Sequence, residues 1–131
     1  MDYRSKHIST YVNRSPDDVY QFVRDPRNLP LWAAGLSDSI AYVNGQWLAG
    51  SPMGKVIVAF APENPFGVLD HAVTLPNGVT VNNPMRVFAH RQGSEVVFSL
   101  LQPEGMAKDE FERDAQMVQK DLHSLKALLE Q

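Results

Sequence analysis

The sequence contains no cysteine, which excludes a disulfide framework and a metal site built on thiolates. No apolar run approaches the roughly 18 residues of a membrane-spanning helix, and the polar residues 1–6 do not resemble a signal peptide. The net charge is −3, without a basic run or a basic–aromatic stripe, so nucleic-acid binding is not expected. We therefore expect a cytoplasmic protein with no membrane insertion.

The length and composition are those of an ordinary globular protein. The chain has 131 residues, 44% of them hydrophobic and 21% charged, which is enough for one domain with a substantial core. No internal repeat, low-complexity segment or linker interrupts it. We expect a single domain over residues 1–131.

The stretch from Met106 to Gln131 has the periodicity of a long amphipathic helix. One face carries the apolar residues Phe111, Ala115, Val118, Leu122, Leu125 and Leu129, widened by Met117 and Leu128. The other face carries Glu112, Arg113, Lys120 and Asp121. The apolar face must be buried against a surface of similar length, which we expect the preceding residues to provide.

The amino-terminal part predicts a strand followed by two short helices. Residues 6–13 alternate in polarity, as in a half-buried strand. Ser15 and Pro16 form a helix start, with Ser15 as N-cap and Pro16 at the first helical position. Asp25 and Pro26 repeat that signal, so a second short helix is expected to run toward Trp32, with a bend or break at Pro30.

The middle of the chain predicts six strands joined by short connections. They are expected at residues 39–43, 46–49, 55–61, 67–75, 79–90 and 95–101. Asn44 and Gly45 suit a two-residue hairpin, whereas Pro84 within the fifth of these strands requires an edge position or a bulge. Short connections favour an antiparallel meander. One face of it would be covered by the long helix, with an apolar cavity between them.

This order resembles the helix-grip fold of the SRPBCC or START-like superfamily. The resemblance rests on ISTYVNRSPDDVYQFVRDPRNLPLW (8–32), NPFGVLDHAVTLPNG (64–78), NNPMRV (82–87), GSEVVFSL (93–100) and GMAKDEFERDAQMVQKDLHSLKALLE (105–130). The last four segments are similar to a bacterial polyketide cyclase-like branch. The resemblance implies an α+β fold: a curved antiparallel sheet of about seven strands wrapped round a long C-terminal helix, with two short helices after strand 1. Members bind lipids, sterols, hormones or aromatic polyketides, but they share no catalytic motif, so the resemblance assigns no catalytic residue.

His71 is the first candidate for chemistry. On an extended strand it shares the more apolar face with Leu69, Val73 and Leu75, while Asp70 points the other way. A general acid or base, or a hydrogen-bonding group for a ligand, is one interpretation. The other, which we favour, is a core histidine whose polar atoms are satisfied by another side chain or by water.

Arg86 is the second candidate, and its direction depends on the interruption at Pro84. A bulge there would turn Arg86 and Phe88 inward, where Arg86 could bind a carboxylate or enolate oxygen. Without a bulge, Met85 and Val87 face inward and Arg86 lies on the surface, which is the arrangement we slightly favour.

A ligand pocket is the expected use of the large apolar side chains. The predicted lining comprises Trp32, Trp47, Phe60, His71, Phe98, Met106, Met117 and Val118; the alternative is that these residues are plain core. The four histidines lie in separate elements without the close pairing of a zinc site, so no metal and no cofactor is expected.

Three functions follow from these patterns. The leading hypothesis is the binding of a small apolar molecule, aromatic or lipid-like, between sheet and helix. The alternative is a polyketide aromatase/cyclase-like enzyme in which His71 removes a proton and Arg86 stabilises the enolate. A third, the binding of another protein through the outer face of the sheet, arises from residues 55–61, which are apolar on both faces. A homodimer contact on that face would explain the pattern, as would a covered strand.

Overall fold

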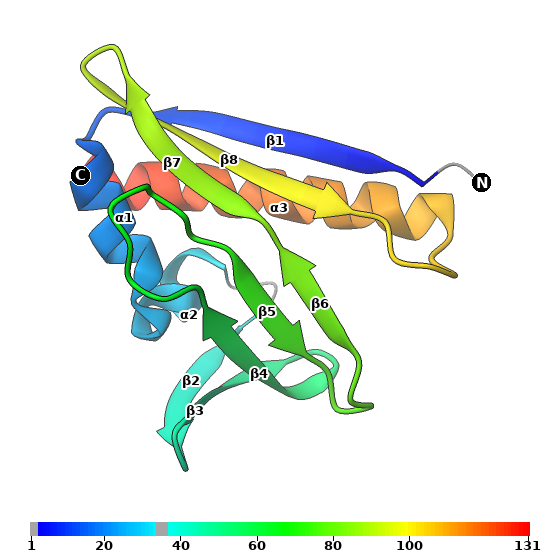
Figure 1. Cartoon of the computed structure of the whole chain (residues 1–131). Helices are drawn as coiled ribbons and strands as arrows, with labels where there is room; N and C mark the ends of the chain where they lie inside the picture. The colour runs from blue at the N-terminus through cyan, green and yellow to red at the C-terminus, as the bar shows by residue number, and fades with distance from the viewer. Residues whose placement is uncertain (1–2, 34–36) are drawn as a thin grey trace.

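The structure, a computed structural model, describes residues 3–33 and 37–131. Within these residues the chain forms eight strands and three α-helices (Figure 1). The strands are β1 (Ser5–Val12), β2 (Ser39–Val43), β3 (Gln46–Ser51), β4 (Gly54–Phe60), β5 (His71–Thr74), β6 (Thr80–Asn83), β7 (Met85–His90) and β8 (Gly93–Leu101). The helices are α1 (Pro16–Arg24), α2 (Leu29–Trp32) and α3 (Lys108–Leu129), with a 3₁₀ turn, η1, at Pro26–Asn28. No helix among them is long and apolar enough to cross a membrane.

The strands form two antiparallel sheets, in the orders β1-β8-β7 and β2-β3-β4-β5-β6. Helix α3 runs along one face of the three-stranded sheet, and α1 and α2 lie near the carboxyl end of α3 (Figure 1). The predicted α+β architecture, with two short helices after the first strand and a long C-terminal helix, is confirmed. The described residues contain eight strands rather than about seven, because the predicted strand at 79–90 divides at Pro84.

Pro84 marks the point where the chain passes from one sheet to the other. Asn83 pairs with His71 in the five-stranded sheet, whereas Met85 pairs with Phe98 in the three-stranded sheet. Proline has no N–H to donate, but its carbonyl accepts a hydrogen bond of 2.9 Å from the Ser99 backbone. The interruption is therefore a change of sheet and not a defect in one strand.

A second connection between the sheets lies just before β5. The Leu69 N–H donates to the Met85 carbonyl at 2.9 Å, and the Val87 N–H donates to the Gly67 carbonyl at 3.0 Å. Gly67 has a φ of +70°, and a Cβ at this position would collide with the Val87 carbonyl. The residues predicted to begin a long strand at Gly67 thus bind β7 first and enter the five-stranded sheet only at His71.

The short helices begin where capping chemistry predicts. The Ser15 hydroxyl accepts a hydrogen bond of 3.1 Å from the Asp18 N–H, and Pro16 occupies the first turn of α1. The Asp25 carboxylate caps η1 in the same way. The expected break falls just before Pro30, where the 3₁₀ turn gives way to α2.

Helix α3 is about 33 Å long at 1.5 Å per residue, and its two halves have different surroundings. Leu122, Leu125 and Leu129 in the second half join the hydrophobic core. Met117, nearer the amino end, is 45% exposed. Ion pairing of Lys6 with Glu112 and a hydrogen bond of 2.7 Å from Lys126 to the Tyr11 carbonyl hold the helix against β1.

This difference predicts unequal costs of truncation along α3. Leu125→Ala removes a side chain with 0% exposure, so it is expected to lower the free energy of unfolding by about 2–5 kcal/mol. Met117→Ala removes a half-exposed, adaptable side chain and should cost less. Chemical denaturation of both variants measures the difference; an equal loss, or a larger one at Met117, would contradict the assignment of core and cavity along the helix.

Candidate functional site

A cavity of about 580 Å³ lies between the sheets and the first part of α3. Its inner end is formed by buried side chains, among them Trp32, His71 and Phe98, and its mouth by exposed residues such as Met53 and Met117. The wall residues come from α2, from the turn between β3 and β4, from β5, β6 and β8, from the connection before α3, and from α3 itself. The cavity exists because the two sheets diverge from their junction at Pro84 and α3 spans the opening.

Six of the eight residues predicted to line a pocket line this cavity: Trp32, His71, Phe98, Met106, Met117 and Val118. Trp47 and Phe60 do not. Their side chains face the same side of the sheet as His71, since Trp47 pairs with Val58 and Phe60 pairs with His71. They lie on β3 and β4, however, and the strands of the five-stranded sheet that reach the cavity are β5 and β6.

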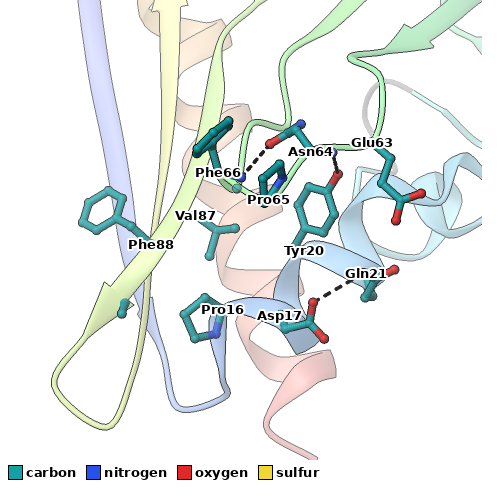
Figure 2. Close-up of a pocket in the computed structure, with 12 residues that line it drawn as sticks. Pro16, Asp17, Tyr20, Gln21, Glu63, Asn64, Pro65, Phe66, Val87 and Phe88 are labelled. Atoms are coloured by element: carbon teal, nitrogen blue, oxygen red, sulfur yellow. Dashed lines mark hydrogen bonds between the residues drawn. The ribbon is translucent and has the colours of Figure 1, made fainter.

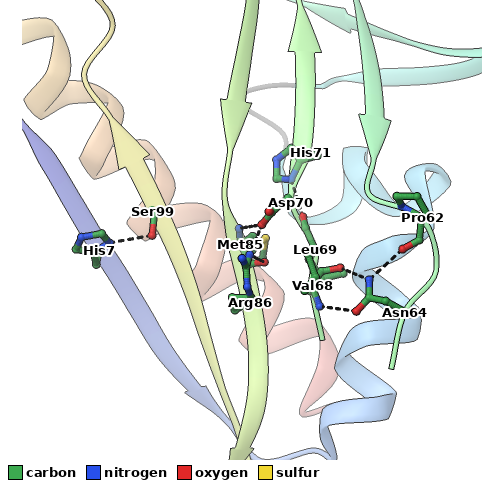
Figure 3. A network of polar contacts seen from close by, with 10 residues as sticks. All are labelled: His7, Pro62, Asn64, Val68, Leu69, Asp70, His71, Met85, Arg86 and Ser99. Carbon is green, nitrogen blue, oxygen red and sulfur yellow. Dashed lines mark hydrogen bonds and ion pairs between the residues drawn. The ribbon is translucent and has the colours of Figure 1, made fainter. Parts of the chain in front are cut away.

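His71 is 3% exposed and is held between two aromatic rings. It stacks on Phe60 with 4.8 Å between ring centroids and meets the edge of Phe98 at 5.8 Å. Its Nδ1 lies 3.0 Å from the Leu69 carbonyl (Figure 3). Because a carbonyl only accepts, Nδ1 carries the hydrogen and Nε2 is left as an acceptor.

The protonation state of His71 follows from its surroundings. Burial lowers the pKa of the imidazole, against smaller opposing effects of the Leu69 carbonyl and the Asp70 charge. The ring is therefore neutral at physiological pH. Nδ1 is satisfied within the core by a backbone carbonyl, and not by the side chain or water that the sequence interpretation expected. The ring also lines the cavity, and its role as an acid, a base or a hydrogen-bonding group for a ligand stays a prediction.

Arg86 points away from the cavity. Its guanidinium pairs with Asp70, whose carboxylate also accepts the Met85 N–H at 2.8 Å (Figure 3). Met85 and Val87 are buried on the opposite side of β7, which is the arrangement without a phase shift. The cyclase mechanism requires His71 and Arg86 to act on one substrate in one cavity. His71 lines the cavity and Arg86 does not, so this requirement is not met.

Two aspartates that the sequence did not single out as site residues line the cavity, Asp114 and Asp121. The helical pattern placed Asp121 on the solvent face, but the structure places it half-buried beside Val118 and Leu122. Burial raises the pKa of Asp121 to about 6, partly offset by Lys120. Burial and the neighbouring Glu110 charge raise the pKa of Asp114 as well. The sequence signal for these two residues is their spacing: Glu110, Asp114 and Asp121 are four and seven residues apart, which places the three carboxylates on one face of the helix.

A second hollow, of about 730 Å³, lies on the surface between α1, the connection after β4, and β7 (Figure 2). Within this hollow the Tyr20 hydroxyl accepts a hydrogen bond of 2.9 Å from the Asn64 N–H. Phe66, which also lines the hollow, is 79% exposed. None of the predicted site residues lines it. We therefore place the candidate site in the cavity beside α3.

The outer face of β4 carries Ile57 and Ala59, opposite the inward Val56 and Val58. Ile57 is partly buried and Ala59 is exposed there, so the described residues do not fully cover the apolar outer face of this strand. The homodimer contact proposed for it stays a prediction.

Neither a model of a known protein family nor a curated protein matches the sequence. Solved structures do match the fold. The protein XoxI from Bacillus cereus superimposes with a TM-score of 0.74 over 95% of this chain and 94% of its own, at 15% identity. Ara h 8.0201 superimposes with a TM-score of 0.70 over 98% of both chains, at 14% identity.

The chain has a helix-grip fold. A third neighbour is the Aha1 dimer from Colwellia psychrerythraea, with a TM-score of 0.72 over 97% of this chain and 96% of that one, at 16% identity. The helix-grip fold that the sequence resemblance implied is thus confirmed. At identities this low the similarity establishes architecture and leaves the function to the cavity itself.

The raised pKa of Asp121 predicts a dependence of stability on pH. Between the unfolded value of 3.8 and the folded value of about 6, the folded state binds more protons, so stability falls as pH rises through this window. Asp121→Asn removes that loss. The free energy of unfolding of the variant minus that of the parent protein, each measured by urea denaturation, is expected to be larger at pH 8 than at pH 4.

Asp109→Asn is the matched control, because Asp109 is an exposed carboxylate on the same helix and lies outside the cavity. An equal pH-dependent gain in both variants would show that the number of charges on α3, and not the burial of Asp121, causes the effect.

Proposed function

We propose that the protein binds a small hydrophobic molecule, aromatic or lipid-like, in the cavity between the sheets and α3. The observation that carries this proposal is a cavity of about 580 Å³ that reaches from exposed residues to a histidine buried in the core. Its volume falls within the roughly 300–1,000 Å³ of small-molecule sites.

The walls of the cavity suit an apolar occupant. Val73, Val81, Phe98, Leu100 and Val118 contribute apolar side chains to it. Protein interiors are otherwise packed to near crystal density, and apolar space left unfilled costs stability. An occupant that fills this space and excludes water from it would therefore bind through the hydrophobic effect and stabilise the fold by mass action.

An enzymatic role has less support. Proton abstraction beside a carbonyl requires both a base and a group that stabilises the enolate oxygen. His71 lines the cavity as a neutral acceptor, but Arg86 is engaged with Asp70 outside it. Binding, without a catalysed step, is the function that these side chains support best.

A cavity-filling variant tests the proposal with a matched control on the same strand. Val81 lines the cavity from β6, whereas its neighbour Asn82 is exposed on the opposite face. The neutral dye N-phenyl-1-naphthylamine, followed by fluorescence, is expected to bind the parent protein saturably at one site. Val81→Trp should weaken this binding at least about tenfold, the equivalent of 1.4 kcal/mol, and Asn82→Trp should leave it unchanged.

Saturable binding that is equal in both variants would place the dye elsewhere, for example in the hollow beside α1. Absence of saturable binding, for this dye and for apolar molecules retained through purification and detected by native mass spectrometry, would overturn the proposal.

A further inference from the structure

The mouth of the cavity carries charge of one sign. Glu104, Glu110, Asp114 and Asp121 line it, and no lysine or arginine of the described residues does. Three of them lie on α3 at spacings of four and seven residues, so they share one face of the helix. The fourth, Glu104, is on the connection that precedes α3.

These carboxylates form no ion pair with the lysines and arginines of residues 3–33 and 37–131. The described part of the chain contains several ion pairs, for example Lys6 with Glu112 on the same helix, but none of them involves the four cavity carboxylates. Like charges gathered at a half-buried site are unfavourable. The Glu110 charge adds to burial in raising the pKa of Asp114, whereas burial raises the pKa of Asp121 against the opposing charge of Lys120. A positive charge placed among them would be stabilised.

Two buried side chains that line the same cavity each leave one polar atom unpaired among the described residues. Trp32 is 3% exposed, and its indole Nε1–H has no hydrogen-bond partner among the described residues. The His71 imidazole, also lining the cavity, uses Nδ1 for the Leu69 carbonyl and offers Nε2 as an acceptor. Buried polar groups in native proteins are nearly always paired. The unpaired Nε2 acceptor of a buried side chain that lines the cavity is an observation, independent of the carboxylates, that points to a ligand there.

We propose that the ligand is an amphipathic organic cation: an amine or quaternary ammonium group bound among the cavity carboxylates, with an apolar or aromatic body extending inward beside Phe98 and Val118. This inference rests on the proposed binding function and adds the charge of the ligand to it. Phe98 and Trp32 offer aromatic surface to the body of such a molecule.

The arrangement disfavours two other classes of ligand. A fatty acid or another organic anion would bring its carboxylate close to these like charges. A metal ion requires convergent ligands, and no group of three histidine, aspartate or glutamate side chains in the described residues could hold one. Carboxylates dispersed around a mouth suit a diffuse organic cation better than a compact metal ion.

Three probes with one aromatic body separate charge from apolarity: naphthylethylamine, naphthylethanol and naphthylacetate. Calorimetric titration of the intact protein at pH 8 keeps the amine protonated and the carboxylates charged. We expect the amine to bind about tenfold more tightly than the alcohol and the acid to bind more weakly than both. Added sodium chloride should weaken the binding of the amine but not that of the alcohol, because salt screens the charges at the open mouth of the cavity.

The double variant Asp114→Asn/Asp121→Asn tests which side chains cause the preference. It keeps the shape of both side chains and removes their charge, so the ratio of amine to alcohol affinity is expected to fall toward one. Asp109→Asn, outside the cavity, should preserve the ratio. Lowering the pH to 5 should reduce the ratio in the parent protein, since Asp121 then gains a proton; the other titratable groups that line the cavity are His71, Glu104, Glu110 and Asp114.

The outcomes separate this inference from the proposed function. Saturable binding of the alcohol with no preference for the amine overturns the inference and leaves the apolar cavity as a binding site. A preference for the amine that survives in the double variant also overturns it. If none of the three probes binds, the proposed function fails together with the inference.

Discussion

The passage of one continuous segment between two sheets at Pro84 is the constraint on which the rest of the structure depends. Asn83 is fixed to β5 and Met85 to β8, only two residues apart, so the sheets are joined at this corner and diverge from it. The backbone of Gly67 and Leu69 reinforces the same junction from the other side. Helix α3 covers the space between the diverging sheets. The leucines near its carboxyl end fill that space, and the part beside its amino-terminal half remains open as the cavity.

The features that the sequence predicts well are those with local causes. The Ser15 cap and the positive φ values at Asn44 and Gly45 depend on neighbouring backbone alone. The inward direction of His71 follows from the period of two along a strand. These local features, taken in order, predict a strand, two short helices, an antiparallel meander and a long covering helix, and the family resemblance implies the helix-grip arrangement of these elements.

The features that the sequence predicts poorly depend on which elements meet in space. Helical periodicity places Asp121 on the polar face of α3, but it does not show that a cavity, instead of solvent, lies beside this residue. Strand alternation turns Trp47 and Phe60 toward the correct side of the sheet, yet the cavity ends at β5. The division at Pro84 was uncertain for the same reason, since the change of sheet depends on pairing partners remote in the chain.

The edge position of β6 has a consequence for how a ligand enters. This strand is four residues long, and among the described residues β5 is its sole ladder partner, while its Val81 and Asn83 form part of the cavity wall. A short edge strand can detach at a lower free energy than the core strands. Admission of a molecule wider than the mouth then requires sub-global unfolding of one strand, on the timescale of native-state hydrogen exchange, while the leucine-packed half of α3 stays folded.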